Sequence, residues 1–70
     1  MSEIGKALRY ERKKRKLTQK QAADLIGISR SYFSDLEAGR YYPSGKVLLK
    51  LNSEFNIFYL LSNDGKTRQK

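Results

Sequence analysis

The sequence predicts an all-α fold, a small bundle of four to five helices. Three features indicate it: apolar residues recur at helical spacing, Ser or Thr stands before these runs, and Gly or Asn follows several of them. With 70 residues the chain forms one small domain, whose core supplies only modest net stability unless a cross-link is present. It contains no Cys and no His, which excludes disulfides and the usual zinc sites. We therefore expect no metal and no cofactor.

The first helix is expected over residues 3–15, with Ser2 as its cap. Its C-terminal half is rich in Lys and Arg, which suits the negative end of the helix dipole and would equally suit a ridge that faces phosphates. For Lys13, Lys14 and Arg15 the first interpretation is favoured. Arg12 follows the core residue Leu8 by one turn and points inward, where an unpaired charge is costly. It should therefore have a carboxylate partner.

The centre of the chain, TQKQAADLIGISRSYFSDLEAG, predicts two short helices joined by a tight turn. Thr18 and Gln21 have the spacing of a capping box at the start of the first, and Gly27 ends it. Ser29 caps the second, which ends at Gly39. The second helix would bury one side, made of Phe33, Leu36 and Glu37. Its outward side would carry Arg30, Ser31, Ser34 and Asp35.

These two helices make a helix-turn-helix motif. Ala22 and Ala23 allow the pair to cross closely, and the second helix displays small and hydrogen-bonding side chains that fit a DNA major groove. The formal net charge of +8 favours a polyanionic partner, although basic composition alone is weak support for nucleic-acid binding.

A fourth helix is expected from the cap Ser44 to residue 55, with Asn56 as its terminator. The apolar run 57–61 is too short to distinguish strand from helix by period, and we favour a short helix. We expect a domain over residues 1–65 and a flexible basic tail over 66–70. No leader-like or membrane-spanning run is visible, so we expect a cytoplasmic protein without a membrane partner.

The chain resembles the Cro/repressor-type (Xre-like) helix-turn-helix family over about residues 4–55. The resemblance is carried by Leu17-Thr18-Gln19, Ala23, Leu25-Ile26-Gly27-Ile28-Ser29, Arg30-Ser31-Tyr32-Phe33-Ser34, Leu36-Glu37, Gly39-Arg40, Pro43-Ser44 and Leu48-Leu49-Lys50-Leu51. It implies a lambda-repressor-like domain that binds a specific double-stranded DNA sequence, most simply as a repressor. It also implies a buried ion pair between Arg12 and Glu37.

The resemblance further implies two sets of DNA contacts. The base-reading set is Arg30, Ser31, Ser34 and Asp35, and the planar fork of Arg30 suits O6 and N7 of a guanine. The phosphate set is Gln19, Ser29, Tyr32, Arg40, Tyr42, Ser44 and Lys46. Gln19 would hold a phosphate at a helix N-terminus, or else be an exposed amide only.

Five further positions keep an alternative. Asp35 either accepts from a cytosine amino group or braces a neighbouring cation. Ser29 either contacts a phosphate or only caps its helix. Tyr32 either lies on a sugar-phosphate edge or a thymine methyl, or rests on the protein surface. Tyr41 and Tyr42 either contact the DNA backbone or pack over the loop proline and the fourth helix.

Three features depart from the family pattern. Glu11 stands where many members have an apolar residue, and Lys16 stands where glycine is common. The apolar cluster Phe58–Leu61 cannot all face a small core, which favours either a symmetric dimer or packing of two of the four residues. The dimer contacts would be Phe58, Tyr59 and Leu61, and a homodimer would bind a palindromic operator.

The sequence also bears on two other function classes. A protein-interaction module, antitoxin-like or anti-regulator, would use the cluster Phe58–Leu61 on a partner. An enzyme is not expected, because a chain without His, Cys or a glycine-rich phosphate loop has nothing to build acid–base or nucleophilic chemistry. No small-molecule ligand is evident.

Overall fold

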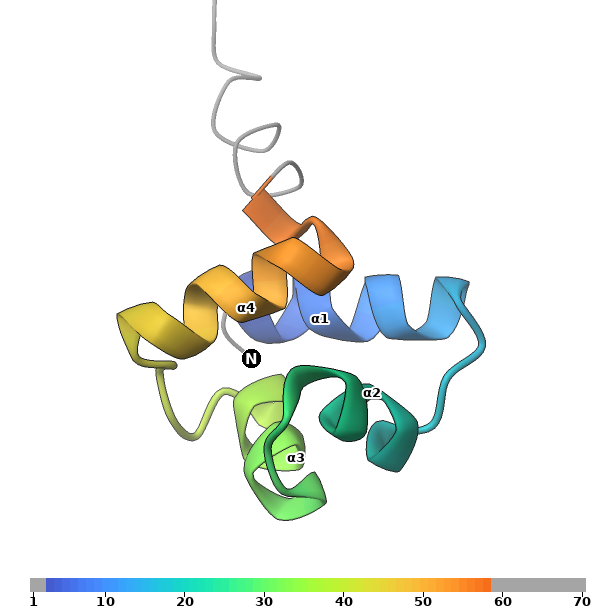
Figure 1. The fold of residues 1–70 in the computed structure, drawn as a ribbon, viewed down its shortest axis with the longest axis horizontal. Coiled ribbons are helices and arrows are strands. Elements are labelled where there is room, and N and C mark those ends of the chain that lie inside the picture. Colours follow the sequence, from blue (N-terminus) through green and yellow to red (C-terminus); the bar gives the residue numbers. More distant parts are fainter. Residues whose placement is uncertain (1–2, 59–70) are drawn as a thin grey trace, which may run out of the picture.

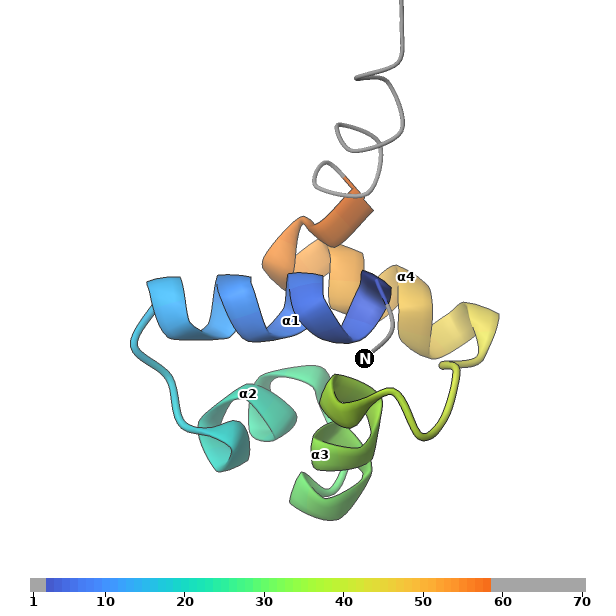
Figure 2. The same cartoon turned by 180° about the vertical axis from the view of Figure 1, so that it is seen from behind.

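The computed structural model describes residues 3–58, and these residues form helices without any strand. The helices are α1 (Glu3–Lys14), α2 (Gln19–Ile26), α3 (Arg30–Ala38) and α4 (Gly45–Phe55). The predicted all-α fold is confirmed. In both views α2 and α3 lie together below α1 (Figures 1 and 2). Helix α4 crosses α1 in front of it in Figure 1 and behind it in Figure 2. Helical backbone resumes at Ile57 and Phe58, whereas the rest of the predicted fifth helix and the tail 66–70 lie outside the described residues.

Three of the helices, α2, α3 and α4, begin directly after the cap residues predicted for them, whereas Ser2, the predicted cap of α1, lies outside the described residues. The Thr18 hydroxyl accepts from the Gln21 backbone N–H at 3.0 Å, and the Gln21 side chain accepts from the Thr18 N–H at 2.9 Å, which completes the capping box. Ser29 caps α3 by accepting from the Tyr32 N–H at 3.1 Å. Ser44 caps α4 in the same way. Local sequence alone therefore sets these starts.

The ends of α2 and α3 are set by glycine. Gly27 and Gly39 have φ values of 85° and 82°, in the left-handed region that side chains with a Cβ rarely enter. Asn56 ends α4 with φ 55°, as its tolerance of this region predicted. Lys16 also has a positive φ, 59°, which accounts for the glycine that is common at this position in the family. Consequently α1 ends at Lys14, one residue earlier than expected.

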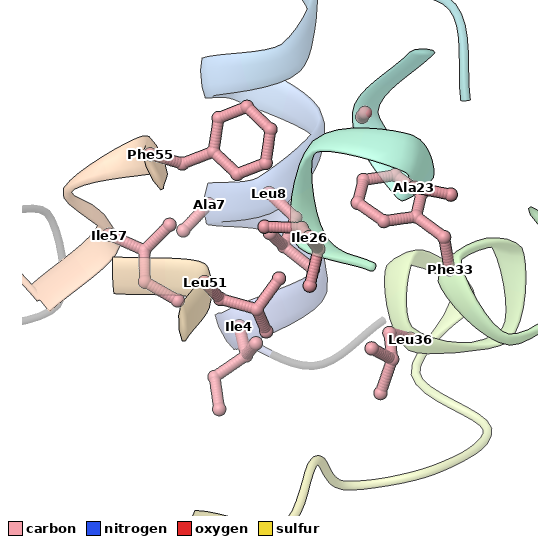
Figure 3. Packing of buried hydrophobic residues seen from close by; sticks show 11 residues of the cluster. Ile4, Ala7, Leu8, Ala23, Ile26, Phe33, Leu36, Leu51, Phe55 and Ile57 are labelled. Atoms are coloured by element: carbon pink, nitrogen blue, oxygen red, sulfur yellow. The ribbon is translucent and has the colours of Figure 1, made fainter. Parts of the chain in front are cut away.

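The core lies where the four helices meet (Figure 3). Ala22 and Ala23 are fully buried and let α2 approach its neighbours closely. Large side chains fill the remaining space, with Phe33 from α3 and Phe55 from α4 both at 0% exposure. Ile57 is also fully buried, so at least this residue of the C-terminal apolar run belongs to the core. The buried apolar set is Ile4, Ala7, Leu8, Ala22, Ala23, Ile26, Phe33, Leu36, Leu51, Phe55 and Ile57.

Gly5 marks the closest approach of α1 to α3. A Cβ at this position would overlap the Glu37 carbonyl oxygen and lie 3.0 Å from the Leu36 carbonyl oxygen. The sequence analysis did not single out Gly5, because its role depends on how two distant helices cross. Its missing side chain brings the end of α3 against α1, and this contact sets the position of Glu37.

Glu11, a departure from the family pattern, is buried at 4% exposure. Its carboxylate pairs with Arg15 and, at 3.5 Å, with Lys14. The Arg15 guanidinium also lies 5.4 Å from the centre of the Phe55 ring, within the range of a cation–π contact. Lys14 and Arg15 thus have carboxylate partners, in addition to the favourable helix dipole that was predicted for them.

Candidate nucleic-acid interface

Helix α3 forms one extremity of the described part of the molecule, with its N-terminal end pointing away from α1 and α4 (Figure 1). Arg30 and Ser31 are exposed on it, and Ser34 and Asp35 are half-buried. Phe33 and Leu36 are fully buried behind them. The predicted division of this helix into an inner and an outer side is therefore present. Among residues 3–58 the Arg30 guanidinium has no protein partner, so its donors are available to a ligand.

Asp35 is paired with Arg40. Its Oδ1 lies 3.0 Å from the Arg40 Nη1, and the Arg40 backbone N–H donates to the Asp35 carbonyl oxygen at 2.9 Å. Two contacts therefore fix the start of the α3–α4 loop against the last turn of α3. Of the two interpretations of Asp35, this geometry favours the one in which it braces a cation. Arg40 keeps most of its side chain exposed, at 65%.

The Glu37 carboxylate, at 1% exposure, is bound by the predicted partner Arg12. The Arg12 Nε lies 2.5 Å from Oε2, and Nη2 lies 3.3 Å from Oε1. Arg12 also donates through Nη1 to the Leu17 carbonyl oxygen at 2.9 Å. A buried charge with this bidentate partner is satisfied, and it ties the C-terminal half of α1 to the end of α3.

Two further side chains converge on the same carboxylate. The Gln19 amide donates to Glu37 Oε1 at 3.0 Å, and the Arg9 Nε lies 3.8 Å from that oxygen. Gln19 is thus a half-buried side chain with a fixed orientation at the start of α2, rather than a free amide. Arg9 was missed by the sequence analysis, although it precedes Arg12 by three residues and so lies on the same side of α1.

The other predicted phosphate contacts surround α3. Ser29 and Ser44 are exposed cap residues, and Lys46 and Tyr42 are exposed in and after the α3–α4 loop. Tyr32 is half-buried against the core, and its ring lies 6.5 Å from the ring of Tyr41 at a tilted angle of 52°. Tyr41 and Tyr42 are 59% and 75% exposed, so neither ring is buried by packing over the loop.

The predicted dimer contacts are described only in part. Phe58 is 37% exposed at the end of the described residues, whereas Tyr59 and Leu61 lie outside them. Within residues 3–58 no group of three His, Cys, Asp or Glu side chains is arranged to hold a metal ion. In the same part of the chain no helix has the length and apolarity that crossing a membrane requires.

A capped helix, a glycine turn and a second helix with an exposed polar side define a helix-turn-helix domain. The chain belongs to the helix-turn-helix family, whose model matches residues 8–57. It is 39% identical over 54 residues to the ImmF control region 10 kDa protein of Bacillus phage phi105, covering 77% of this chain and 60% of that protein.

Two further relatives have descriptive names. The immunity repressor protein of Bacillus phage phi105 is 49% identical over 45 residues, which cover 64% of this chain and 31% of that protein. The HTH-type transcriptional regulator ImmR of Bacillus subtilis (strain 168) is 36% identical over 63 residues, which cover 87% of this chain and 50% of that protein. The chain thus spans between 31% and 60% of the length of these relatives. No solved structure gives a significant match.

Proposed function

We propose that this protein binds a specific double-stranded DNA sequence through α3 and represses transcription by occupying a promoter. The observation that carries the proposal is the exposed Arg30 guanidinium, which has no partner within the described part of the chain, on a helix whose opposite side is held in the core. A guanidinium in this position can donate both of its parallel N–H groups to one guanine. Relatives named as an immunity repressor and a transcriptional regulator support the same function.

In this proposal the base-reading side chains are Arg30, Ser31 and Ser34. Asp35 has a different role, because its pairing with Arg40 would hold that cation at the edge of the DNA backbone. Gln19, fixed by Glu37, would donate its second amide hydrogen to a phosphate next to the free N–H groups of the first turn of α2. Phosphate contacts position the domain, and the α3 side chains supply the discrimination.

The remaining phosphate contacts would also position the domain on the DNA. Around α3, the side chains that would contact the backbone are Ser29, Tyr32, Tyr42, Ser44 and Lys46. Two copies of the domain, joined through Phe58 and the residues after it, would bind a palindromic operator with half-sites about one DNA turn apart. A cytoplasmic location fits this function.

Selection of duplexes from a random pool by the purified chain tests the proposal. We expect enrichment of one sequence, with guanine at the position that Arg30 reads, and binding that weakens steeply as salt is raised. Recovery of unrelated sequences with equal affinity would contradict sequence-specific binding. The protein-interaction function would then be favoured, since such a module has no reason to enrich a palindrome.

A further inference from the structure

A groove on the side of the molecule shares only Lys46 with the proposed DNA interface. It lies between the turn that follows α2 and the N-terminal half of α4, which are on the same side of the molecule in Figure 1, with α1 behind them. Its volume is about 580 Å³. The α2 side contributes Ile26, Gly27 and Ile28, and the α4 side contributes Val47 and Leu49.

The apolar lining of the groove is only partly covered by the rest of the protein. Ile26 is buried at 6% exposure and Val47 and Ile28 are half-buried, but Leu49 is 65% exposed. A leucine left this far in water beside other apolar side chains is typical of a surface that a partner covers. DNA is a poor candidate for this lining, because phosphates gain nothing from apolar contacts.

Two lysines flank the apolar lining. Lys46 and Lys50 are one helical turn apart on α4 and are exposed. Neither ammonium group has a carboxylate partner among residues 3–58, although Glu54 follows Lys50 by four positions. Elsewhere in this part of the chain Lys14 and Lys20 are paired with carboxylates, whereas Lys6, Lys13 and Lys16 are not. The groove therefore offers an apolar lining with uncompensated positive charge at its rim, and no acidic side chain of the described residues lines it.

We infer that this groove binds an acidic amphipathic helical segment of another protein. The apolar side of such a helix would cover Val47 and Leu49, and its carboxylates would pair with Lys46 and Lys50. A second copy of this chain is a poor occupant, because each copy carries a net charge of +8 and would add like charge at the lysine rim. The inference does not rest on DNA binding, since Lys46 is the one lining residue that is also a proposed phosphate contact.

The test uses a synthetic helical peptide with leucines at i, i+3 and i+7 and glutamates on the flanking positions. A scrambled peptide of the same composition is its control, so that overall charge cannot account for a difference. Fluorescence anisotropy with the full chain should give about tenfold tighter binding of the amphipathic peptide than of the scrambled one. Amide chemical-shift changes should be confined to the groove segments 26–28 and 46–50.

Matched variants separate the groove from general electrostatic attraction. Lys50→Glu and Lys6→Glu change the net charge equally, and both positions are exposed. Lys50→Glu should remove the preference for the amphipathic peptide, whereas Lys6→Glu should keep it. In the same way Leu49→Ser should remove the preference, and Tyr10→Ser, at a 56% exposed position on α1, should keep it. Lys46 is left unchanged because it is also a proposed phosphate contact.

Three results would overturn the inference. The first is equal binding of the two peptides by the parent chain. The second is an equal loss in Lys50→Glu and Lys6→Glu, which would mean attraction by net charge only. The third is self-association of the parent that Leu49→Ser abolishes, which would identify a second copy as the occupant. Since none of these measurements contains DNA, a failure here leaves the proposed function to be judged by the duplex selection.

Discussion

A single carboxylate connects three of the four helices described. Glu37 on α3 is bound by Arg12 on α1 and by Gln19 on α2, and its side chain is almost fully buried. Such a pair adds little net stability compared with apolar residues of the same size, because both charges must be desolvated. Removing only one partner is different, since the other charge is then left buried without compensation.

Glu37→Ala should therefore lower the free energy of unfolding by about 3–5 kcal/mol, enough to unfold most of a domain this small. Urea unfolding followed by circular dichroism measures the change. Glu3→Ala, at an exposed position in the first turn of α1, is the control and should stay close to the parent. A Glu37→Ala protein that melts within a degree or two of the parent would show that Arg12 does not depend on this carboxylate.

Replacing glycine by alanine should lower the stability of the protein at one position and raise it at another. Gly5→Ala forces α1 and α3 apart, because the new methyl group would overlap the Glu37 carbonyl oxygen, and should cost about 1–3 kcal/mol of stability. Gly45→Ala at the start of α4 meets nothing within 4 Å and should stabilise the protein by up to about 1 kcal/mol, since alanine restricts the unfolded chain and favours helix. Paired thermal melts of the two variants measure this difference, and equal shifts would contradict the close crossing.

At the scale of elements, we expect α3 to read the base sequence and the loop after it to contact the DNA backbone. Arg30 begins α3 without a partner among residues 3–58, whereas Arg40 is held by Asp35 at the other end of the helix. Arg30→Ala should cost about 1–3 kcal/mol on the selected sequence and relax the preference at one base pair. Arg40→Ala should weaken selected and random duplexes by similar factors, because a phosphate contact carries no sequence information.

Competition binding with single-base variants of the selected duplex measures both effects. Ser53→Ala, at an exposed position on the C-terminal half of α4, serves as the control and should leave affinity and preference unchanged. An unchanged base preference in Arg30→Ala would mean that the reading side of α3 is wrongly assigned.

The elements themselves were predictable because their signals are local. Thr18 and Gln21 are three residues apart, and the left-handed Gly27 needs no distant partner, so the bounds of α2 follow from a few neighbouring residues. The inner side of α3 follows from helical period alone. The ion pair of Arg12 and Glu37 was anticipated from a family resemblance and from the cost of a buried charge, not from spacing.

The contacts that the sequence did not predict depend on how the helices cross. Arg9 and Gln19 reach Glu37 only because α1, α2 and α3 meet at that point, and no short-range pattern links the three residues. Gly5 looks like an ordinary helical glycine until the Glu37 carbonyl is seen against it. The burial of Glu11 is similar, since its partner Arg15 is local but the Phe55 ring beneath the Arg15 guanidinium comes from α4.

At the scale of the whole molecule, the charge of +8 opposes self-association and favours DNA. Two free copies repel each other, whereas on a duplex the phosphates neutralise both copies and release counterions. If the dimer contact extends from the exposed Phe58, it has to form against this repulsion. We therefore expect the protein to be a monomer in free solution at low salt and to pair on DNA.

Sedimentation velocity with a labelled duplex tests this expectation. A palindromic duplex that carries both half-sites should bind two chains, and the second chain should bind more tightly than the first because the two copies then contact each other. A duplex with one half-site replaced should bind one chain at the same salt concentration. Phe58→Asp should remove the advantage of the second chain while leaving binding to the single half-site intact, since α3 is at the opposite end of the described residues (Figure 1). Equal affinities for both chains would show that the copies bind DNA without contacting each other. Saturation of the palindrome by one chain would contradict pairing on DNA.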